Sequence, residues 1–194
     1  MARGIFQQID VTSRAEWRAW LQKNHTQKES IWLAIAKRGY PGVSVAEAVE
    51  EALCFGWIDG RANKLDEKRF KILLSPRKSK STWSKINKVR VSSLIKAGLM
   101  QPSGMTMIKL AKKNGAWSTL NDIDQVKYPD DLIRALAKNK KAKANFDSFP
   151  PSTKKQILFW IQSARAPETR NKRITETITK AAKNIRANQY VKKK

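Results

Sequence analysis

The 194-residue chain has 41% hydrophobic residues, enough to bury a core in one ordinary domain or in a small domain with a helical extension. It carries 40 Lys and Arg residues against 16 Asp and Glu, a formal net charge of +24 at pH 7. This surplus predicts long-range attraction to polyanions. The single cysteine, Cys54, excludes an intramolecular disulfide, and neither it nor the lone His25 has the neighbouring ligands of a metal site. No cofactor is expected.

The chain has no run that approaches the roughly 20 apolar residues needed to cross a bilayer. Residues 1–6 also lack the apolar segment of a secretory signal. We therefore expect a cytoplasmic protein without a transmembrane segment. Contact with a membrane would be limited to the attraction of basic helices to anionic lipids.

The first part of the chain predicts helices alternating with strands. Residues 13–24 place their apolar side chains at helical spacing, and residues 31–37 form a short apolar run rich in strand formers. Residues 44–55 open with a capping box and predict a second helix. Residues 57–64 and 69–76 flank a polar turn and predict a β-hairpin. The expected fold is α+β, with a small, about three-stranded antiparallel sheet packed by helices.

Beyond residue 81 the pattern predicts helices only. Their expected ranges are 82–97, 102–114, 129–138, 140–147, 151–163 and 167–186. From Arg134 onward there are 17 Lys or Arg and 3 acidic residues, a net +14. We therefore expect a soft boundary that separates an α+β core, residues 1–128, from a basic all-helical C-terminal region, residues 129–194. The final lysines, 192–194, are expected to fray.

Polar side chains recur at every second position after Trp57. If this segment is a strand, Asp59, Arg61 and Asn63 share one face of the sheet. Two interpretations stay open. The carboxylate and the guanidinium pair weakly or face water, or they form the floor of a pocket.

Hydroxyl groups and cations gather at the start of the next predicted helix, in residues 75–90. Ser81 is the expected N-cap, so the N–H groups of the first turn would point toward whatever lies beside Arg77. Such an arrangement can hold a phosphate or a carboxylate. Capping by Ser81 and packing of Trp83 explain the same residues without a ligand. The segment lacks the glycines of a P-loop, which disfavours nucleotide binding by that mechanism.

Three motifs follow one another along the chain: ALCFGWIDG at 52–60, the segment 76–100 with the following Gly104, and SARAPETRNKRITETI at 163–178. Together they resemble the YdeI/OmpD-associated, or bacteriocin-protection, family, and the resemblance covers most of the chain. The resemblance implies no established reaction that could be transferred to this chain.

The family pattern, with Arg61 added from the predicted strand, gives a set of candidate ligand-binding residues. They are Trp57, Asp59, Arg61, Arg77, Ser81, Trp83, Ser84, Asn87, Arg90, Arg170 and Arg173. The last two follow Pro167 and Glu168, which are also favoured at an ordinary helix start. Arg170 and Arg173 could still reach back to an anion or to Asp59.

Three functions are compatible with these residues. The first is stress or bacteriocin protection through binding of a small anionic ligand or an anionic macromolecule. The second is nonspecific nucleic-acid binding by the basic C-terminal helices. The third is an enzyme with Asp59 as general base, Arg77 as an oxyanion or phosphate clamp, and Ser81 or Ser84 as a nucleophile. A non-catalytic protein is favoured because no partnered histidine is available to activate a serine. The oligomeric state is not indicated.

Overall fold

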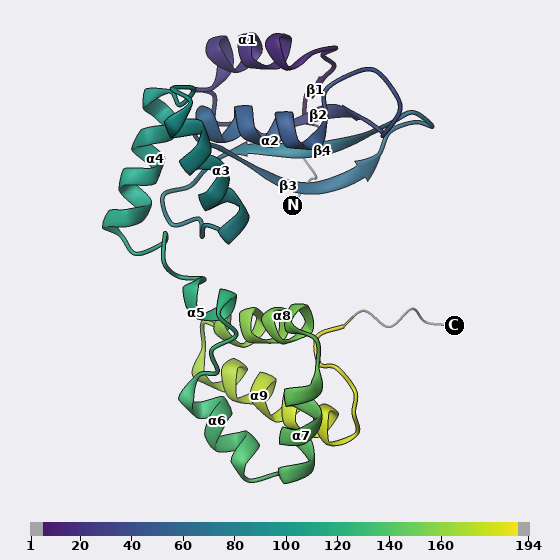
Figure 1. Ribbon diagram of the computed structural model, residues 1–194, viewed down its shortest axis with the longest axis vertical. Coiled ribbons are helices and arrows are strands. Elements are labelled where there is room, and N and C mark those ends of the chain that lie inside the picture. Colours follow the sequence, from purple (N-terminus) through teal and green to yellow (C-terminus); the bar gives the residue numbers. More distant parts are fainter. Residues whose placement is uncertain (1–5, 190–194) are drawn as a thin grey trace. The chain divides into compact units, whose positions relative to one another are not determined.

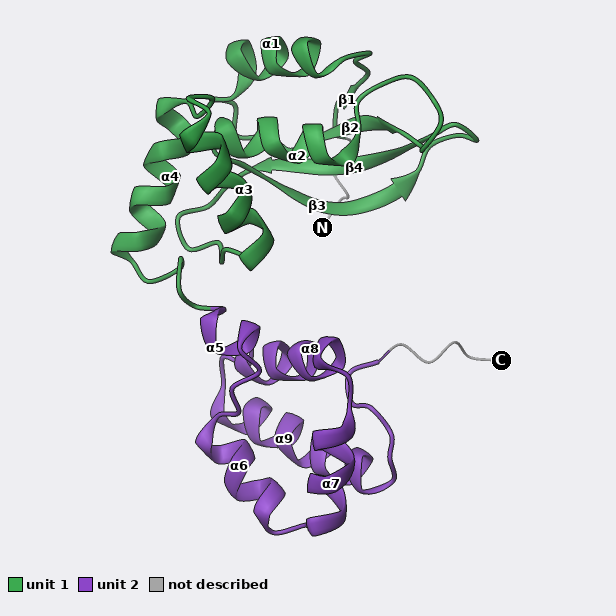
Figure 2. Cartoon of the chain, viewed as in Figure 1, with its two compact units in different colours: residues 1–119 green, residues 120–194 purple. Residues whose placement is uncertain are grey.

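The computed structural model describes residues 6–189. The first five residues, part of the segment considered as a signal, and residues 190–194, with the lysines expected to fray, lie outside this range. The chain divides into two compact units, residues 1–119 and 120–194 (Figure 2). The division falls before the boundary expected near residue 128. Unit 1 holds the sheet and unit 2 is helical, so the expected α+β class is confirmed.

The sheet of unit 1 has four strands in the order β1-β2-β4-β3. They are β1 (Gln8–Ile9), β2 (Ile31–Ala36), β3 (Trp57–Lys64) and β4 (Arg69–Pro76). The three expected strands are present, and β4 pairs antiparallel with both β2 and β3. The additional strand, β1, pairs parallel with β2, which makes the sheet mixed. Two residues are too few to show an alternating pattern, so the sequence did not predict β1.

Four helices accompany the sheet in unit 1. They are α1 (Arg14–Asn24), α2 (Val45–Cys54), α3 (Lys85–Lys96) and α4 (Pro102–Lys113). The Ser13 side chain caps α1, and Ser44 and Glu47 form the expected capping box of α2. Figure 1 shows α1 and α2 on one face of the sheet. Helices α3 and α4 both contact α2.

The core of unit 1 lies between the sheet and these helices. Strand β2 contributes Ile31, Leu33 and Ile35, and β4 contributes Ile72 and Leu74, all of them buried. Because successive side chains of a strand point to opposite faces, these alternate residues define the face that the helices cover.

Helix α4 approaches the C-terminal end of α2 closely at Gly104. A Cβ atom at this position would overlap the carbonyl oxygen of Cys54. The adjacent Gln101 N–H donates to that same oxygen at 3.1 Å. Only glycine allows this backbone contact, which fixes the segment around Gly56 against α4.

Unit 2 consists of helices packed around a separate core. They are α5 (Asn121–Asp124), α6 (Asp130–Ala137), α7 (Lys140–Ser148), α8 (Pro151–Gln162) and α9 (Pro167–Ala182). The one-turn helix α5 was not expected. Helix α9 ends earlier than expected because Asn184 adopts a left-handed conformation, with φ of 55°. Within residues 6–189 no helix is long and apolar enough to cross a membrane.

Candidate anion-binding site at Arg77

A β-bulge in β3 separates the polar residues that were expected on one face. Asp59 pairs with Leu74 and Ala62 with Ile72, so one additional residue of β3 lies between these pairs. Paired residues share a face, which places Asp59 on the core side of the sheet. Asn63 pairs with Lys71 on the opposite side. The expectation that Asp59, Arg61 and Asn63 share one face was therefore wrong, because the bulge shifts the alternation by one residue.

Arg61 contacts the sheet face that the helices leave uncovered. Its guanidinium carbon lies 5.5 Å from the ring centroid of Trp32, and the Lys71 ammonium lies 5.3 Å from the same centroid. Trp57, by contrast, is a core residue, and its indole Nε1 donates to the His25 carbonyl oxygen at 2.9 Å. The backbone of Trp57 lies beside that of Arg77, because Trp57 pairs with Pro76 and the preceding Gly56 accepts the Arg77 N–H.

The loop before α3 differs from the expectation at its cap. Ser84 caps the helix by accepting a hydrogen bond from the Asn87 N–H at 3.3 Å. The assignment of Ser81 as the cap was wrong, because burial of Trp83 holds the chain in a non-helical conformation up to Ser84. The Ser81 N–H instead closes a turn on the Lys78 carbonyl oxygen at 2.9 Å.

Asn87 and Arg90 lie one turn apart at the start of α3. Arg90 Nη1 donates to Asn87 Oδ1 at 3.2 Å, and Asn87 is buried. Both side chains therefore support the N-terminal end of the helix.

Arg77 follows β4 directly and is only 6% exposed. Its backbone N–H donates to the Gly56 carbonyl oxygen at 2.9 Å, which fixes the residue beside the turn between α2 and β3. Its guanidinium carbon lies 3.8 Å from the ring centroid of Trp83. Nη1 donates to the Thr82 carbonyl oxygen at 3.1 Å. The side chain is thus held in one place by a stacked ring and a single hydrogen bond.

The remaining edge of the Arg77 guanidinium has no acceptor. Nε and Nη2 are both buried and lack a hydrogen-bond partner within the described part of the chain. These two nitrogens form the edge with which an arginine holds two oxygens of a carboxylate or phosphate. The Nε1 atom of Trp83 is a third buried donor without a partner there. Because buried donors are nearly always bonded, three such atoms on two stacked side chains indicate a site for an acceptor.

The charge of Arg77 is not neutralised by an ion pair. Burial lowers the pKa of Arg77 to about 10, although the charge of Asp59 acts in the opposite direction. Asp59 is exposed, and the ion pairs found within residues 6–189 do not include one between it and Arg77. The Arg77 side chain therefore combines a buried positive charge with hydrogen-bond donors that have no acceptor in the described part of the chain.

A second tryptophan and two lysines extend this cluster. The ring centroids of Trp83 and Trp117 lie 5.0 Å apart, and the ammonium groups of Lys88 and Lys112 lie 5.7 and 5.3 Å from Trp117. The sequence reasoning did not single out Trp117. Its position after the Gly115 helix stop, outside the apolar repeat of α4, is the signal that could have identified it.

The segment that follows Arg77 is held by few hydrogen bonds. Besides the Ser81 turn, the Asn114 side chain at the end of α4 donates to the Ser79 carbonyl oxygen at 2.8 Å. Residues 78–84 form neither helix nor strand. A ligand could reach Arg77 if the turn at residues 78–81 moved while Trp83 stayed stacked on the guanidinium, because few backbone bonds would have to break.

The arginines near the C-terminus belong to unit 2 and have partners within it. Arg170 Nε and Nη2 donate to the two carboxylate oxygens of Asp131 at 2.6 and 3.0 Å. Arg173 donates to the Trp160 carbonyl oxygen and to Ser163 Oγ. These bonds connect α9 to α6 and to α8, so the edge of Arg170 that would hold an anion is occupied.

Comparison with known families separates the two parts of the chain. Residues 9–107, about half of the chain, match the family model of a domain of unknown function, DUF8412. The chain belongs to this family. The DUF8412 match contains the sheet and Arg77, and its description names no activity.

Residues 125–184 match a second family model, described as bacteriocin-protection, YdeI or OmpD-associated, which confirms the resemblance to that family. The motif at 163–178 lies inside this match, whereas the motifs at 52–60 and 76–100 lie inside the DUF8412 match. Neither the curated proteins nor the solved structures contain a match to the chain.

Proposed function

We propose that unit 1 binds a small oxyanion, a carboxylate or a phosphate group, at the guanidinium of Arg77. The observation that carries the proposal is the buried Nε and Nη2 edge without an acceptor. Removing an ion from water costs several kcal/mol, whereas stacking on an indole returns about 2 kcal/mol. A bound oxyanion would supply both the missing charge and the missing acceptors.

The ligand's acceptor group needs at least two oxygens. Two parallel bonds to Nε and Nη2 would orient it in the plane of the Arg77 guanidinium. The Trp83 indole N–H offers a third donor, which a phosphate can use more easily than a carboxylate because it presents more oxygens. Binding requires the turn at residues 78–81 to move aside while Trp83 stays stacked on Arg77, so we expect association slower than diffusion.

Equilibrium unfolding in different anions tests the proposal. Sodium phosphate and sodium acetate are compared with sodium chloride at equal ionic strength, for the wild-type chain and for Arg77→Met. An anion present at 100 times its dissociation constant should stabilise wild-type unit 1 by about 2.7 kcal/mol. Arg61→Met, which removes the same charge from the sheet face, should retain this gain. A gain that survives in Arg77→Met would reject the site.

A second candidate function, nonspecific nucleic-acid binding, is favoured by the charge of unit 2. Residues 120–194 contain 18 Lys or Arg and 7 acidic residues, a net +11. Ion pairs within the described residues involve four of these cations: Lys127, Lys143, Arg170 and Lys180. Binding of labelled DNA and RNA to the full chain across a salt series is the test. Nonspecific binding predicts that the affinity for DNA and RNA falls steeply as the salt concentration rises. The absence of binding at physiological salt would exclude this function.

We further propose that anion binding serves a protective role in the cell, because the description of the family matched by unit 2 names bacteriocin protection. Survival under bacteriocin is compared for cells that lack the protein and cells complemented with wild type or Arg77→Met. Protection by the wild type alone supports the connection. Equal protection by wild type and Arg77→Met would show that the anion site is not needed for protection.

A further inference from the structure

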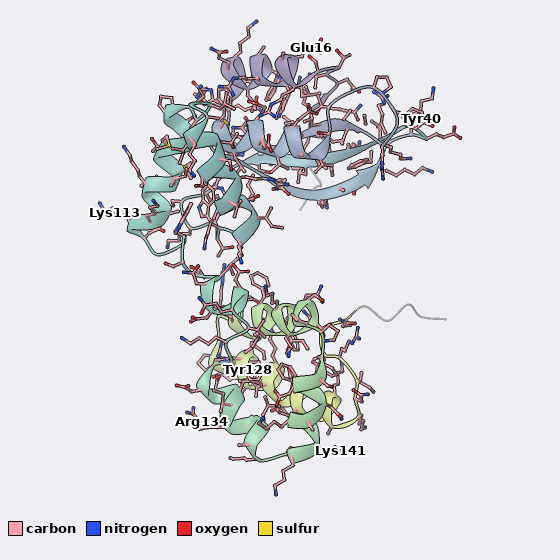
Figure 3. All side chains as sticks on the ribbon, viewed as in Figure 1. Glu16, Tyr40, Lys113, Tyr128, Arg134 and Lys141 are labelled. Atoms are coloured by element: carbon pink, nitrogen blue, oxygen red, sulfur yellow. The ribbon has the colours of Figure 1, made fainter. Side chains whose placement is uncertain are left out.

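We propose that the groove between α6 and α9 of unit 2 docks an acidic amphipathic helix of a partner protein. This inference is independent of the anion site in unit 1. The groove has a volume of about 570 Å³ and is lined by residues of these two helices and of the turn that joins α6 to α7. Arg134 of α6 and Lys138, which directly follows this helix, line one side of the groove, and Arg134 is visible on α6 in Figure 3. Helix α9 contributes the opposite side.

The floor of the groove is apolar. It is formed by Ala135 of α6 and by Ile174 and Ile178 of α9. The two isoleucines lie four residues apart and therefore one above the other on the same helix face. A floor of this kind favours aliphatic side chains that recur once per helical turn on a partner.

The exposed side chains of α9 form a low ridge beside this floor. Asn171, Thr175 and Thr179 are spaced four residues apart, and all three are exposed. A second hollow, of about 470 Å³, is lined by the same three residues together with Lys172, Glu176 and Lys180. The side chains of a second helix can pack into the hollows on either side of this ridge of small side chains.

The positive charge beside the groove favours an acidic partner. Arg134 and Lys138 lie one turn apart, and neither forms an ion pair within the part of the chain that the structure describes. The acidic residue of the lining, Asp131, is bonded to Arg170. The groove thus offers a positive side to a partner, which favours glutamate or aspartate flanking the partner's apolar face.

Two other occupants fit less well. A second copy of this chain carries the same net charge of +24, so electrostatic repulsion opposes its approach. A nucleic-acid strand would find no aromatic side chain in the lining on which to stack its bases.

The test measures binding of the full chain to a fluorescent synthetic peptide by anisotropy. The peptide, of roughly 18 residues, carries leucines at helical spacing on one face and glutamates elsewhere, and a scrambled isomer lacks the apolar face. We expect the double variant R134E/K138E and the groove-filling variant Thr175→Trp each to weaken binding about tenfold or more. The matched control K140E/K141E changes the charge equally at exposed positions of α7 that do not line the groove, and it should leave binding unchanged. Figure 3 shows Lys141 on this helix.

Several outcomes would overturn the proposal. Equal binding of the scrambled peptide, or equal weakening by K140E/K141E, would show that attraction depends on charge alone. Unchanged binding in Thr175→Trp, with helicity confirmed by circular dichroism, would place the peptide elsewhere. An oligonucleotide that displaces the peptide and is itself excluded by Thr175→Trp would make the groove a nucleic-acid site. A dimer in sedimentation that Thr175→Trp abolishes would make it an interface between copies.

Discussion

Replacement of Arg77 by methionine shows whether this arginine serves stability or binding. Methionine has a similar length and no charge, so it removes the desolvated cation while filling most of its volume. Burial lowers the pKa of Arg77 from the ordinary arginine value to about 10. At about 1.4 kcal/mol per pKa unit, this shift corresponds to roughly 3 kcal/mol of destabilisation of the charged side chain in the folded state. The substitution relieves that cost.

The same substitution removes two favourable contacts of Arg77. Stacking on Trp83 contributes about 2 kcal/mol at a desolvated site, and the hydrogen bond to the Thr82 carbonyl oxygen contributes about 1.5 kcal/mol. Gain and loss cancel closely. We therefore expect Arg77→Met to change the free energy of unfolding of unligated unit 1 by about 1 kcal/mol or less.

Urea unfolding followed by tryptophan fluorescence measures this change, since six of the seven tryptophans lie in unit 1. An arginine whose donors are all bonded to the protein behaves differently, because its removal leaves buried acceptors or a buried charge without a partner. Loss of such a pair costs about 3 to 5 kcal/mol. A loss of that size in Arg77→Met would refute the reasoning and assign Arg77 a structural role.

Two further substitutions test the packing and the ion pair described above. Gly104→Ala should destabilise unit 1 by about 3 kcal/mol or more in urea, because its Cβ would overlap the Cys54 carbonyl oxygen. Gly60→Ala meets only ordinary contacts at a position without a positive φ, so it should leave stability unchanged or raise it by up to about 1 kcal/mol. A similar loss for both alanine variants would contradict the close approach of α4 to α2. In unit 2, the hydrogen bonds from Arg170 lower the pKa of Asp131. The stabilisation from this pair is therefore present above pH 3.8, the ordinary aspartate pKa, and is lost as the pH falls through the lowered pKa. Arg170→Gln should remove about 1 kcal/mol of unit 2 stability near pH 6 and much less near pH 2. Urea unfolding followed by circular dichroism measures this loss. An equal loss at both pH values would exclude the Arg170–Asp131 pair as its cause.

Local signals predicted most of the elements. The capping box of α2 and the hairpin formed by β3 and β4 each depend on a few neighbouring residues, and both are present in the structure. The bulge between Asp59 and Ala62 depends instead on the register with β4, which no single-strand pattern contains. The same limit applies to the cap of α3. Ser81 and Ser84 satisfy the local rule equally well, and burial of Trp83 decides between them.

The candidate site was predicted by residue type but not by arrangement. Arg77 and Trp83 were identified from a local segment, and the structure stacks one on the other. Their relation to Trp117 is tertiary and had no local signal. The partner of Arg170 was missed for the same reason, since Asp131 lies 39 residues away in the chain.

The most direct test of the anion site is nuclear magnetic resonance of the Arg77 side chain. The Nε–H resonance of Arg77 is assigned by its absence from Arg77→Met and is then followed during titrations with sodium phosphate and sodium acetate at constant ionic strength. Our account predicts a saturable shift of this resonance with at least one of the two anions, accompanied by a shift of the Trp83 Nε1–H resonance. A resonance of Arg77 that does not respond to either anion, while other signals of the protein do, would contradict the central claim.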